Sequence, residues 1–447
     1  MKRSAWRYLW SAQDIRRKLL ITLLILAIYR LASHVPVPGA DKDVMAAIMG
    51  SGGAAGNLIN ILDLLSGGTV SRFSVLAMGV YPYITAQIIL QLLTPIIPSW
   101  QKKMEEDPRE GQKWQEKWTY YLAVPMAALQ AIGQVNIFNN SAIQIGLPPV
   151  IEDFGLSNFL PSLAIVASMT AGTMFAIWLG ELISEYGLRN QGLSLIIFAG
   201  IVARIPATFQ AIFADETTRW IGIIFMLALT LITIFAIVVV QQGRRNVPVM
   251  YPGRRVGSRM SMPVKGTLPL MVNMAGMIPI IFAQSLLTFP SIIASFFTSS
   301  TNETIANFAS SIVNMFGGTG NVYWIMYFLM VVFFAFFYTD VLFAQQNYGE
   351  NLKKVGAQIP GVARGAPTQK YLTRVLRRIT LPGAVFLGII AILPWLVGLL
   401  VPFGKNSGLL LTSSSGLLIV VGVVRDTFFS IDADLKLHGY DDSLLVR

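Results

Sequence analysis

NLINILDLLSGGTVSRFSVLAMGVYPYITAQIILQLLTPII, residues 57–97, is the stretch on which the interpretation of the whole chain depends. It opens with apolar residues at helical spacing, opposite a polar stripe of Asn57, Asn60 and Asp63. Gly67 and Gly68 suit the left-handed turn that ends a helix. The stretch therefore predicts a short amphipathic helix with the apolar residues Leu58, Ile61, Leu62 and Leu65.

This predicted helix is too short to cross a membrane. At about 1.5 Å per residue, its roughly nine residues reach about halfway through the ~30 Å hydrocarbon core of a bilayer. The apolar run from Phe73 to Ile97 that follows is long enough to span it. Backbone at membrane depth must be shielded by protein or line an aqueous cavity. The residues alone leave two alternatives, a helix lying on the lipid surface and a segment folded back into the protein.

Composition indicates a membrane protein with many spans. Of 447 residues, 54% are apolar and only 13% are charged, and the mean hydropathy is +0.60. The chain has no cysteine and only two histidines, His34 and His438, which argues against disulfides, a thiolate nucleophile and an intrinsic zinc site. It also lacks a GxxxxGK[ST] phosphate loop. We therefore expect no cofactor, no bound metal and no enzymatic activity.

Ten apolar runs predict ten membrane-spanning helices. Residues 1–18 carry six basic residues and one acid, which places the amino terminus on the cytoplasmic side, and ten spans return the carboxyl terminus to that side. Residues 99–117 are predicted to form a solvated cytoplasmic loop and residues 290–320 an outer loop. The expected spans are 19–35, 73–97, 118–138, 159–180, 191–212, 220–241, 267–289, 322–343, 379–400 and 409–428.

Two loops on the predicted cytoplasmic side, 243–266 and 344–378, together carry thirteen basic residues and one acid. One interpretation is that they only orient the chain in the membrane. The other is that they form protruding hairpins, with Pro and Gly at 252–253 and 360–361, which bind phosphate backbones or an acidic protein. The candidate binding residues are Arg244, Arg245, Arg254, Arg255, Arg259, Lys265, Lys353, Lys354, Arg364 and Lys370.

Four long phrases resemble the SecY/Sec61-alpha family, whose bacterial members are pore subunits of the protein-conducting channel. They are DLLSGGTVSRFSVLAMGVYPYITAQIILQLLTP (63–95), SLIIFAGIVARIP (194–206), LPLMVNMAGMIPIIFAQSLLTFP (268–290) and ENLKKVGAQIPG (350–361). The resemblance covers nearly the whole chain. It implies an all-α fold in which ten spans form two pseudo-symmetric inverted halves, 1–212 and 213–447, around an hourglass pore. One departure is that Ala363 stands at the family's loop-tip arginine, with Arg364 next to it.

The resemblance also implies roles for the short helix and for a ring of pore residues. Residues 57–72 would form a re-entrant plug, with plug residues Asn57, Leu58, Ile61, Leu62, Asp63, Leu65, Ser66, Gly67 and Gly68. The constriction ring would fall on Val80, Ile84, Leu193, Ile197, Ile281 and Ile419. An apolar ring cannot replace the hydration shell of an ion, yet it can adapt to an extended polypeptide. Without the resemblance, each of these would be read as an ordinary packed or lipid-facing side chain.

A lateral gate and a set of partners follow from the same resemblance. Spans two and seven would part to release transmembrane segments into lipid, with polar gate positions at Gln91, Gln130 and Asn273. Amide hydrogen bonds between membrane helices contribute about 0.6–2 kcal/mol each, and a purely structural role for these amides remains open. The implied partners are SecE-like and SecG-like small membrane subunits, a ribosome (large-subunit RNA and proteins) or a SecA ATPase at the cytoplasmic loops, the secretory polypeptide and the lipid bilayer.

The expected function is passage of unfolded secretory polypeptides across a bacterial plasma membrane, and a plastid membrane is the alternative location. A secondary transporter of small solutes also has inverted halves and broken helices. Ion coupling, however, usually needs buried acids, and the acids in or near spans are Asp63, Glu181 and Asp340. An intramembrane enzyme would need an Asp pair, a histidine metal set or a Ser–Lys dyad, and the spans contain none of these. The transporter therefore stays as the alternative function.

Overall fold

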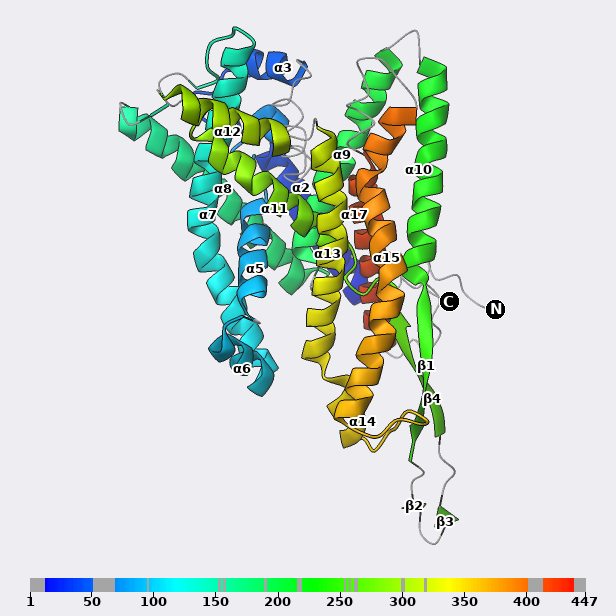
Figure 1. Ribbon diagram of the computed structural model, residues 1–447. Helices are drawn as coiled ribbons and strands as arrows, with labels where there is room; N and C mark the ends of the chain where they lie inside the picture. The colour runs from blue at the N-terminus through cyan, green and yellow to red at the C-terminus, as the bar shows by residue number, and fades with distance from the viewer. Residues whose placement is uncertain are drawn as a thin grey trace.

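The computed structural model describes residues 13–50, 69–94, 96–151, 154–155, 158–188, 191–214, 219–252, 255–256, 259–260, 264–298, 302–316, 320–400 and 413–437. Most of these residues form helices that run alongside one another, which confirms the predicted helical membrane fold (Figure 1). Within the described ranges, six helices are long and apolar enough to cross a membrane. The count of ten spans stays a prediction. The plug residues 57–68 lie outside the described residues.

The elements have the following bounds. The helices of the first part of the chain are α2 (Gln13–Ala32), α3 (Lys42–Gly50), the 3-10 turn η1 (Val70–Arg72), α5 (Tyr81–Leu93), α6 (Pro98–Glu106), α7 (Pro108–Gln144), α8 (Phe159–Tyr186) and α9 (Gly192–Ala214). The second part contains α10 (Arg219–Gln242), α11 (Ile278–Ser295), α12 (Glu303–Phe316), α13 (Asn321–Gln346), α14 (Tyr348–Lys354), α15 (Ala366–Leu400) and α17 (Ser413–Leu437). Two antiparallel pairs complete the fold, β1 (Arg244–Tyr251) with β4 (Val264–Met271), and β2 (Arg255–Val256) with β3 (Arg259–Met260).

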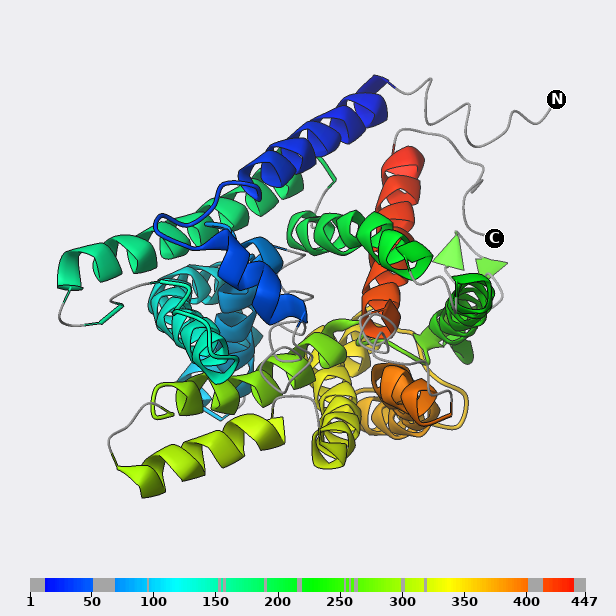
Figure 2. The ribbon, with the colours of Figure 1, turned by 90° about the horizontal axis from the view of Figure 1, so that it is seen from above.

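The short elements gather at the two ends of the helix bundle. The β1–β4 hairpin, α6 and α14 lie at one end, and α3 and α12 lie at the other (Figure 1). From above, the blue and cyan helices of the first part occupy one side, and the yellow and orange helices α13 and α15 occupy the other (Figure 2). Helix α11 joins the two sides, because it contacts α5 and α7 as well as α13 and α15. The hairpin and α14 belong to the two basic loops, so both basic loops lie at the same end of the bundle.

The helix of the second predicted span begins later than expected. The sequence predicted a span over 73–97 in a near-continuous apolar run that Gly79 and Pro82 interrupt, but α5 begins only at Tyr81. Phe73 and Gly79 have positive φ angles, and Pro82 lies in the first helical turn, where proline is tolerated because its N–H is not needed. The turns before α5 are held against the loop that follows α2, because the Val37 N–H donates a hydrogen bond to the Phe73 carbonyl at 2.9 Å. The prediction of a helix over 73–80 was wrong.

The seventh predicted span also begins later. Residues 264–271 form strand β4, in which Leu268 pairs with Val247 of β1, and helix α11 starts at Ile278. Gly276, with φ +64°, makes the turn between strand and helix, and Pro279 lies in the first turn of α11. Val247 and Val249 alternate with exposed residues and are buried, as expected of a strand with one covered face. The prediction of a helix over 267–277 was wrong.

Two predicted loops contain helices. Residues 99–117 belong to α6 and the start of α7, and residues 303–316 of the predicted outer loop form α12. The break between α6 and α7 is set by Asp107, whose carboxylate accepts hydrogen bonds from the N–H groups of Arg109 (3.0 Å) and Glu110 (3.2 Å). Polar, charged surface segments form stable helices when they are capped and packed on one side, and hydropathy alone does not reveal this.

Candidate functional site

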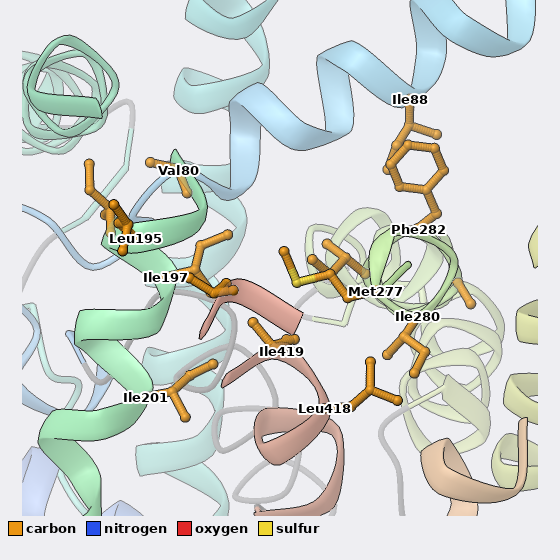
Figure 3. Close-up of a cluster of buried hydrophobic side chains, with 14 of the residues drawn as sticks. Val80, Ile88, Leu195, Ile197, Ile201, Met277, Ile280, Phe282, Leu418 and Ile419 are labelled. Atoms are coloured by element: carbon orange, nitrogen blue, oxygen red, sulfur yellow. The ribbon is translucent and has the colours of Figure 1, made fainter. Parts of the chain in front are cut away.

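Branched apolar side chains from four separate elements meet in the middle of the bundle. Val80, at the start of α5, Ile197 of α9 and Ile419 of α17 are buried, and Figure 3 shows Ile197 and Ile419 pointing toward one another. Ile281 of α11 is buried in the same contiguous hydrophobic cluster, and Ile84 of α5 packs against it. The structure therefore brings these five predicted ring residues into one cluster.

The sixth predicted ring residue, Leu193 of α9, is partly buried and packs against the same cluster, as Ile84 does. Its side chain packs on α8, where its Cδ2 atom lies 2.8 Å from the position that a Cβ on Gly180 would take. Met277, which was not among the predicted ring residues, belongs to the cluster. It lies at the start of α11 and points toward Ile197 and Ile419 in Figure 3. Sequence reasoning missed Met277 because its place beside the ring depends on where α11 begins. The only available signal was the Gly276–Met277–Ile278–Pro279 run, which is typical of a helix start.

A seam separates α11 from α5 and α7, and a few direct contacts cross it. The Tyr81 hydroxyl of α5 donates a hydrogen bond to the Ser285 carbonyl of α11 at 3.1 Å. The Ser295 hydroxyl lies 3.4 Å from the Gly133 carbonyl of α7. Near the end of the bundle opposite the β hairpin, the Asn140 amide donates to the Thr298 hydroxyl at 2.6 Å. These bonds join segments that lie more than 150 residues apart in the chain.

The seam is tightly packed at Gly133 of α7. A Cβ atom at this position would lie 2.4 Å from the Cγ2 atom of Ile292 in α11, well inside ordinary van der Waals contact. Ile292 is 2% exposed, so its branched side chain fills the space that glycine leaves. The absence of a side chain at position 133 is what allows α7 and α11 to approach this closely.

None of the three predicted gate amides makes a hydrogen bond across this seam in the described structure. Gln130 of α7 is buried, and its Nε2 atom lies 3.4 Å from the Thr85 hydroxyl of α5, on its own side of the seam. Asn273 precedes α11 and donates to the Gly276 carbonyl at 3.1 Å within the same turn. Gln91 is half-buried, with an Oε1 atom that finds no partner among the described residues.

Gln130 nevertheless borders the seam. Together with Tyr81 and Ile292 it lines a small internal cavity, and its buried Oε1 atom finds no partner among the described residues. A buried acceptor without a hydrogen bond costs about 1–3 kcal/mol. The seam therefore combines apolar packing, as at Ile292, with a buried amide oxygen of Gln130 that has no partner among the described residues.

The segment that should carry the plug lies outside the described residues, but both of its flanks are described. α3 ends at Gly50 before it, and η1 begins at Val70 after it. The Thr69 hydroxyl donates to the Leu76 carbonyl at 2.7 Å, and the Val75 N–H donates to the Val35 carbonyl at 2.9 Å. Both flanks thus lie at the end of the bundle opposite the β hairpin (Figure 1).

The two basic loops form one continuous structure at the hairpin end. Met250 of β1 and Gln358, which follows α14, exchange two backbone hydrogen bonds of 2.8 and 2.9 Å. Beneath them, Val247, Val249 and Leu270 share a hydrophobic cluster with residues of α13, α14 and α15. The sequence analysis predicted two separate hairpins, because backbone pairing between residues more than a hundred positions apart leaves no local signal in the sequence.

Most of the predicted partner-binding residues are exposed on this joined structure. Arg364 is exposed, and its guanidinium Nε donates to the Gln358 side-chain oxygen at 3.1 Å. Arg255 and Arg259 lie on β2 and β3, and Arg254 lies outside the described residues. The remaining exposed members are Arg244, Arg245, Lys265, Lys353, Lys354 and Lys370.

A cleft of about 940 Å³ opens between α14 and the start of α15 in this structure. Its lining is strongly basic, and Glu350 is the acid in it. The guanidinium of Arg377 is already paired with Asp340 of α13, at 2.8 Å between Nη2 and Oδ2. No salt bridge engages the other basic lining residues within the described part of the chain: Lys353, Lys370, Arg374 and Arg378. The surface as a whole suits polyanionic partners.

Comparisons with known proteins agree on one family. The SecY family model matches residues 74–428. A protein translocase subunit SecY of Streptomyces scabiei is 36% identical over 447 residues, covering 99% of each chain. Among solved structures, one described as the structure of a protein conducting channel aligns with a TM-score of 0.60 at 16% identity, covering 96% of this chain and 94% of that one. Sec61 in a canine ribosome-channel complex aligns with a TM-score of 0.58 at 16% identity, with the same coverage.

Proposed function

The chain belongs to the SecY family and is a channel subunit of a protein translocase; we propose that polypeptides pass through the central apolar cluster of Figure 3. Branched apolar side chains from α5, α9, α11 and α17 supply this cluster, and it carries the proposal. A small-solute transporter is not favoured, because the relatives are translocase subunits.

The proposed constriction consists of Val80, Ile84, Leu193, Ile197, Ile281 and Ile419, with Met277 as an added member. Burial of Val80, Ile197, Ile281 and Ile419 in one cluster supports it. Apolar side chains resist ions because they offer nothing in exchange for the hydration shell. They also do not hydrogen-bond to a passing polypeptide, so an extended chain of any sequence slides between them.

The constriction is tested by Ile281→Asn and Ile419→Asn. Each change places a hydrogen-bonding amide in the narrowest part of the path, so the resting channel should conduct ions in planar bilayers. Ile419→Leu keeps an apolar side chain of similar volume and should stay closed. Val424→Asn alters the exposed side of the same helix α17 and serves as the matched control. Unchanged conductance in both Ile→Asn variants would contradict the constriction.

The lateral gate is proposed to lie along the seam between α11 and the pair α5 and α7. Support comes from hydrogen bonds that cross it, from Tyr81 to Ser285 and from Asn140 to Thr298. Interhelical hydrogen bonds of this kind are worth about 0.6–2 kcal/mol each in membranes. They are weak enough for a hydrophobic signal segment to replace. Gln91, Gln130 and Asn273 remain proposed polar positions beside the gate.

The plug is proposed to be the segment 57–72. Two described elements, α3 before it and η1 at its end, lie at the end of the bundle opposite the β hairpin. This position supports a segment that folds back toward the constriction. Deletion of residues 57–68 should raise ion leakage of the resting channel. A deletion variant that conducts no more than the unmodified protein would argue against this role.

The joined basic structure at the hairpin end is proposed as the docking site of a ribosome or a SecA-type ATPase. Its support is the exposed basic side chains on β1, β4, α14 and the start of α15. One of the solved structures that this chain resembles is a Sec61 in a ribosome-channel complex. Small SecE-like and SecG-like membrane subunits complete the proposed assembly.

The remaining proposals concern location and symmetry. Six helices suited to spanning within the described ranges make this a multi-pass membrane protein, and its bacterial relatives support the bacterial plasma membrane as its location. Basic residues concentrate on cytoplasmic loops, so the hairpin end and both termini are proposed to be cytoplasmic. The two halves, 1–212 and 213–447, are proposed to be inverted repeats around the pore.

A further inference from the structure

Helix α12, at the end of the bundle opposite the β hairpin, presents three chemically distinct faces. The first face packs on α11. It consists of small side chains, with Ala309 fully buried and Ala306, Ser310 and Val313 partly buried. Small residues at a helix contact allow the two backbones to approach closely. This face is therefore an ordinary protein contact.

The second face is apolar and exposed. Ile305, Phe308 and Met315 are 44%, 69% and 43% exposed, and Ile312 between them is partly exposed. The spacing of these residues places them in one stripe along the helix. In water, an exposed stripe of this composition would be unfavourable.

The third face is polar and exposed, and it consists of Glu303, Asn307, Ser311 and Asn314. At about 100° per residue, the polar and apolar stripes are separated by roughly a third of a turn. A helix with one side on protein, one side apolar and one side polar fits a boundary between lipid and water.

We infer that α12 lies in the outer boundary of the bilayer, with Ile305, Phe308 and Met315 inserted among lipid chains. In Figure 1, α12 runs across the direction of α13 rather than along it. Its 14 residues span about 21 Å, too little to cross a membrane. It also connects the outer ends of two membrane helices, α11 and α13.

The two helices that α12 connects also expose apolar side chains. Helix α13 exposes Val322, Ile325 and Leu329 from its first turn onward, at helical spacing. On α11, Phe297 just beyond the helix end is 51% exposed. Exposed apolar side chains on a membrane-spanning helix face lipid, and the apolar stripe of α12 has the same composition.

Insertion of α12 rests on apolar contact and not on charge. Glu303 is its only charged residue, and it has no lysine or arginine to attract anionic headgroups. Surface helices that bind by charge respond to lipid composition, whereas this helix should lie at the same depth in neutral and anionic membranes.

The chain contains no cysteine, so single cysteines can carry spin labels without any background substitution. Labels replace Ile305, Phe308 and Met315 on one stripe and Asn307, Ser311 and Asn314 on the other. The full chain is placed in vesicles of phosphatidylcholine, and separately in vesicles that also contain phosphatidylglycerol. Collision with oxygen, which concentrates in lipid, is measured against collision with a water-soluble nickel chelate.

The first set should favour oxygen and the second set nickel, by several-fold, in both kinds of vesicle. Equal nickel access at both sets would place α12 in water. Shielding of the first set from both reagents would show that a second copy or another protein covers this face. Dependence of the oxygen preference on phosphatidylglycerol would contradict insertion by apolar contact. Each of these results overturns the inference.

A second measurement uses the unmodified chain. Met315 and Met271 are almost equally exposed, at 43% and 42%, but Met271 lies on β4 at the hairpin end. In lipid nanodiscs, where both ends are open to solvent, hydrogen peroxide should oxidise Met271 several-fold faster than Met315. In detergent-free nanodiscs, equal oxidation rates would contradict the burial of Met315 in lipid.

Discussion

Replacing Gly133 by alanine should loosen the seam between α7 and α11. The added Cβ would lie 2.4 Å from Cγ2 of Ile292, about 1 Å inside normal contact. Ile292 is β-branched and fully buried, so its side chain has few alternative rotamers. Overpacking of this kind costs about 1–3 kcal/mol. If the closed seam bears the cost and the open seam does not, the ratio of closed to open channels falls by about 5- to 150-fold.

Two assays measure this shift. Purified Gly133→Ala protein in planar bilayers should open more often, and vesicles containing it should translocate a secretory protein whose signal segment is weakened. Gly320→Ala is the matched control, because an added Cβ there comes only within 4.0 Å of the Val322 nitrogen. It should behave as the unmodified chain does.

The specific contact is tested by adding Ile292→Ala. This change removes Cγ2 and creates space for the new methyl group, so the double variant should open less than the sum of the two single effects predicts. Strictly additive effects would show that positions 133 and 292 are not coupled across the seam. Unchanged opening of Gly133→Ala would refute the reasoning altogether.

Three further predictions concern contacts seen in the structure. Tyr81→Phe removes the hydroxyl that donates to the Ser285 carbonyl, so the open probability of the channel should rise by about 3- to 10-fold. An unchanged open probability would show that this hydrogen bond does not help to hold the gate closed. Replacing three exposed residues of the hairpin by Glu, namely Arg244, Arg245 and Lys265, should weaken ribosome or SecA binding at least tenfold at low salt, measured by co-sedimentation. Equal affinity would indicate that these residues only orient the chain in the membrane. Gln358→Pro removes the N–H that donates to the Met250 carbonyl, whereas Gln358→Ala keeps it. The proline variant should therefore bind the ribosome or SecA several-fold more weakly than the alanine variant. Equal binding by both would show that the pairing of the two loops is not needed.

Much of the fold was predictable because hydropathy is a local property. The apolar runs from 118, 159, 191, 220 and 322 all coincide with helices. The two basic loops stand out for the same reason. Helix α12 was missed because the segment around it is rich in Ser, Thr and Asn. The spacing of its residues indicates an amphipathic helix, but only its contact with α11 shows which face is covered by protein.

The helix starts were harder to predict than the helices themselves. Residues 73–80 are as apolar as the helix that follows, but they fold into turns because Phe73 and Gly79 take positive φ angles. In strand β4, Leu268 and Leu270 are apolar like a span, yet they pair with β1. Apolar composition reports burial and does not by itself distinguish helix, strand and turn.

In the candidate site, too, features within one helix were predictable and contacts between helices were not. Ring residues on one helix face, such as Val80 and Ile84, follow from spacing once the family resemblance is given. Contacts across the seam, such as Tyr81 with Ser285, depend on how two helices are rotated against each other. That rotation depends on contacts between residues far apart in sequence, as the packing of Ile292 on Gly133 illustrates, and such contacts leave no local sign in the sequence.

Crosslinking of a stalled secretory chain to the constriction is the most direct test of the proposed path. A photoreactive amino acid is placed at Ile84, Ile197 or Ile419, and at the exposed Val424 of the same helix α17 as the control. A polypeptide halted midway should crosslink at all three constriction positions and not at Val424. Crosslinks at Val424 that equal those at the three positions, or none at the three, would contradict passage through the central apolar cluster.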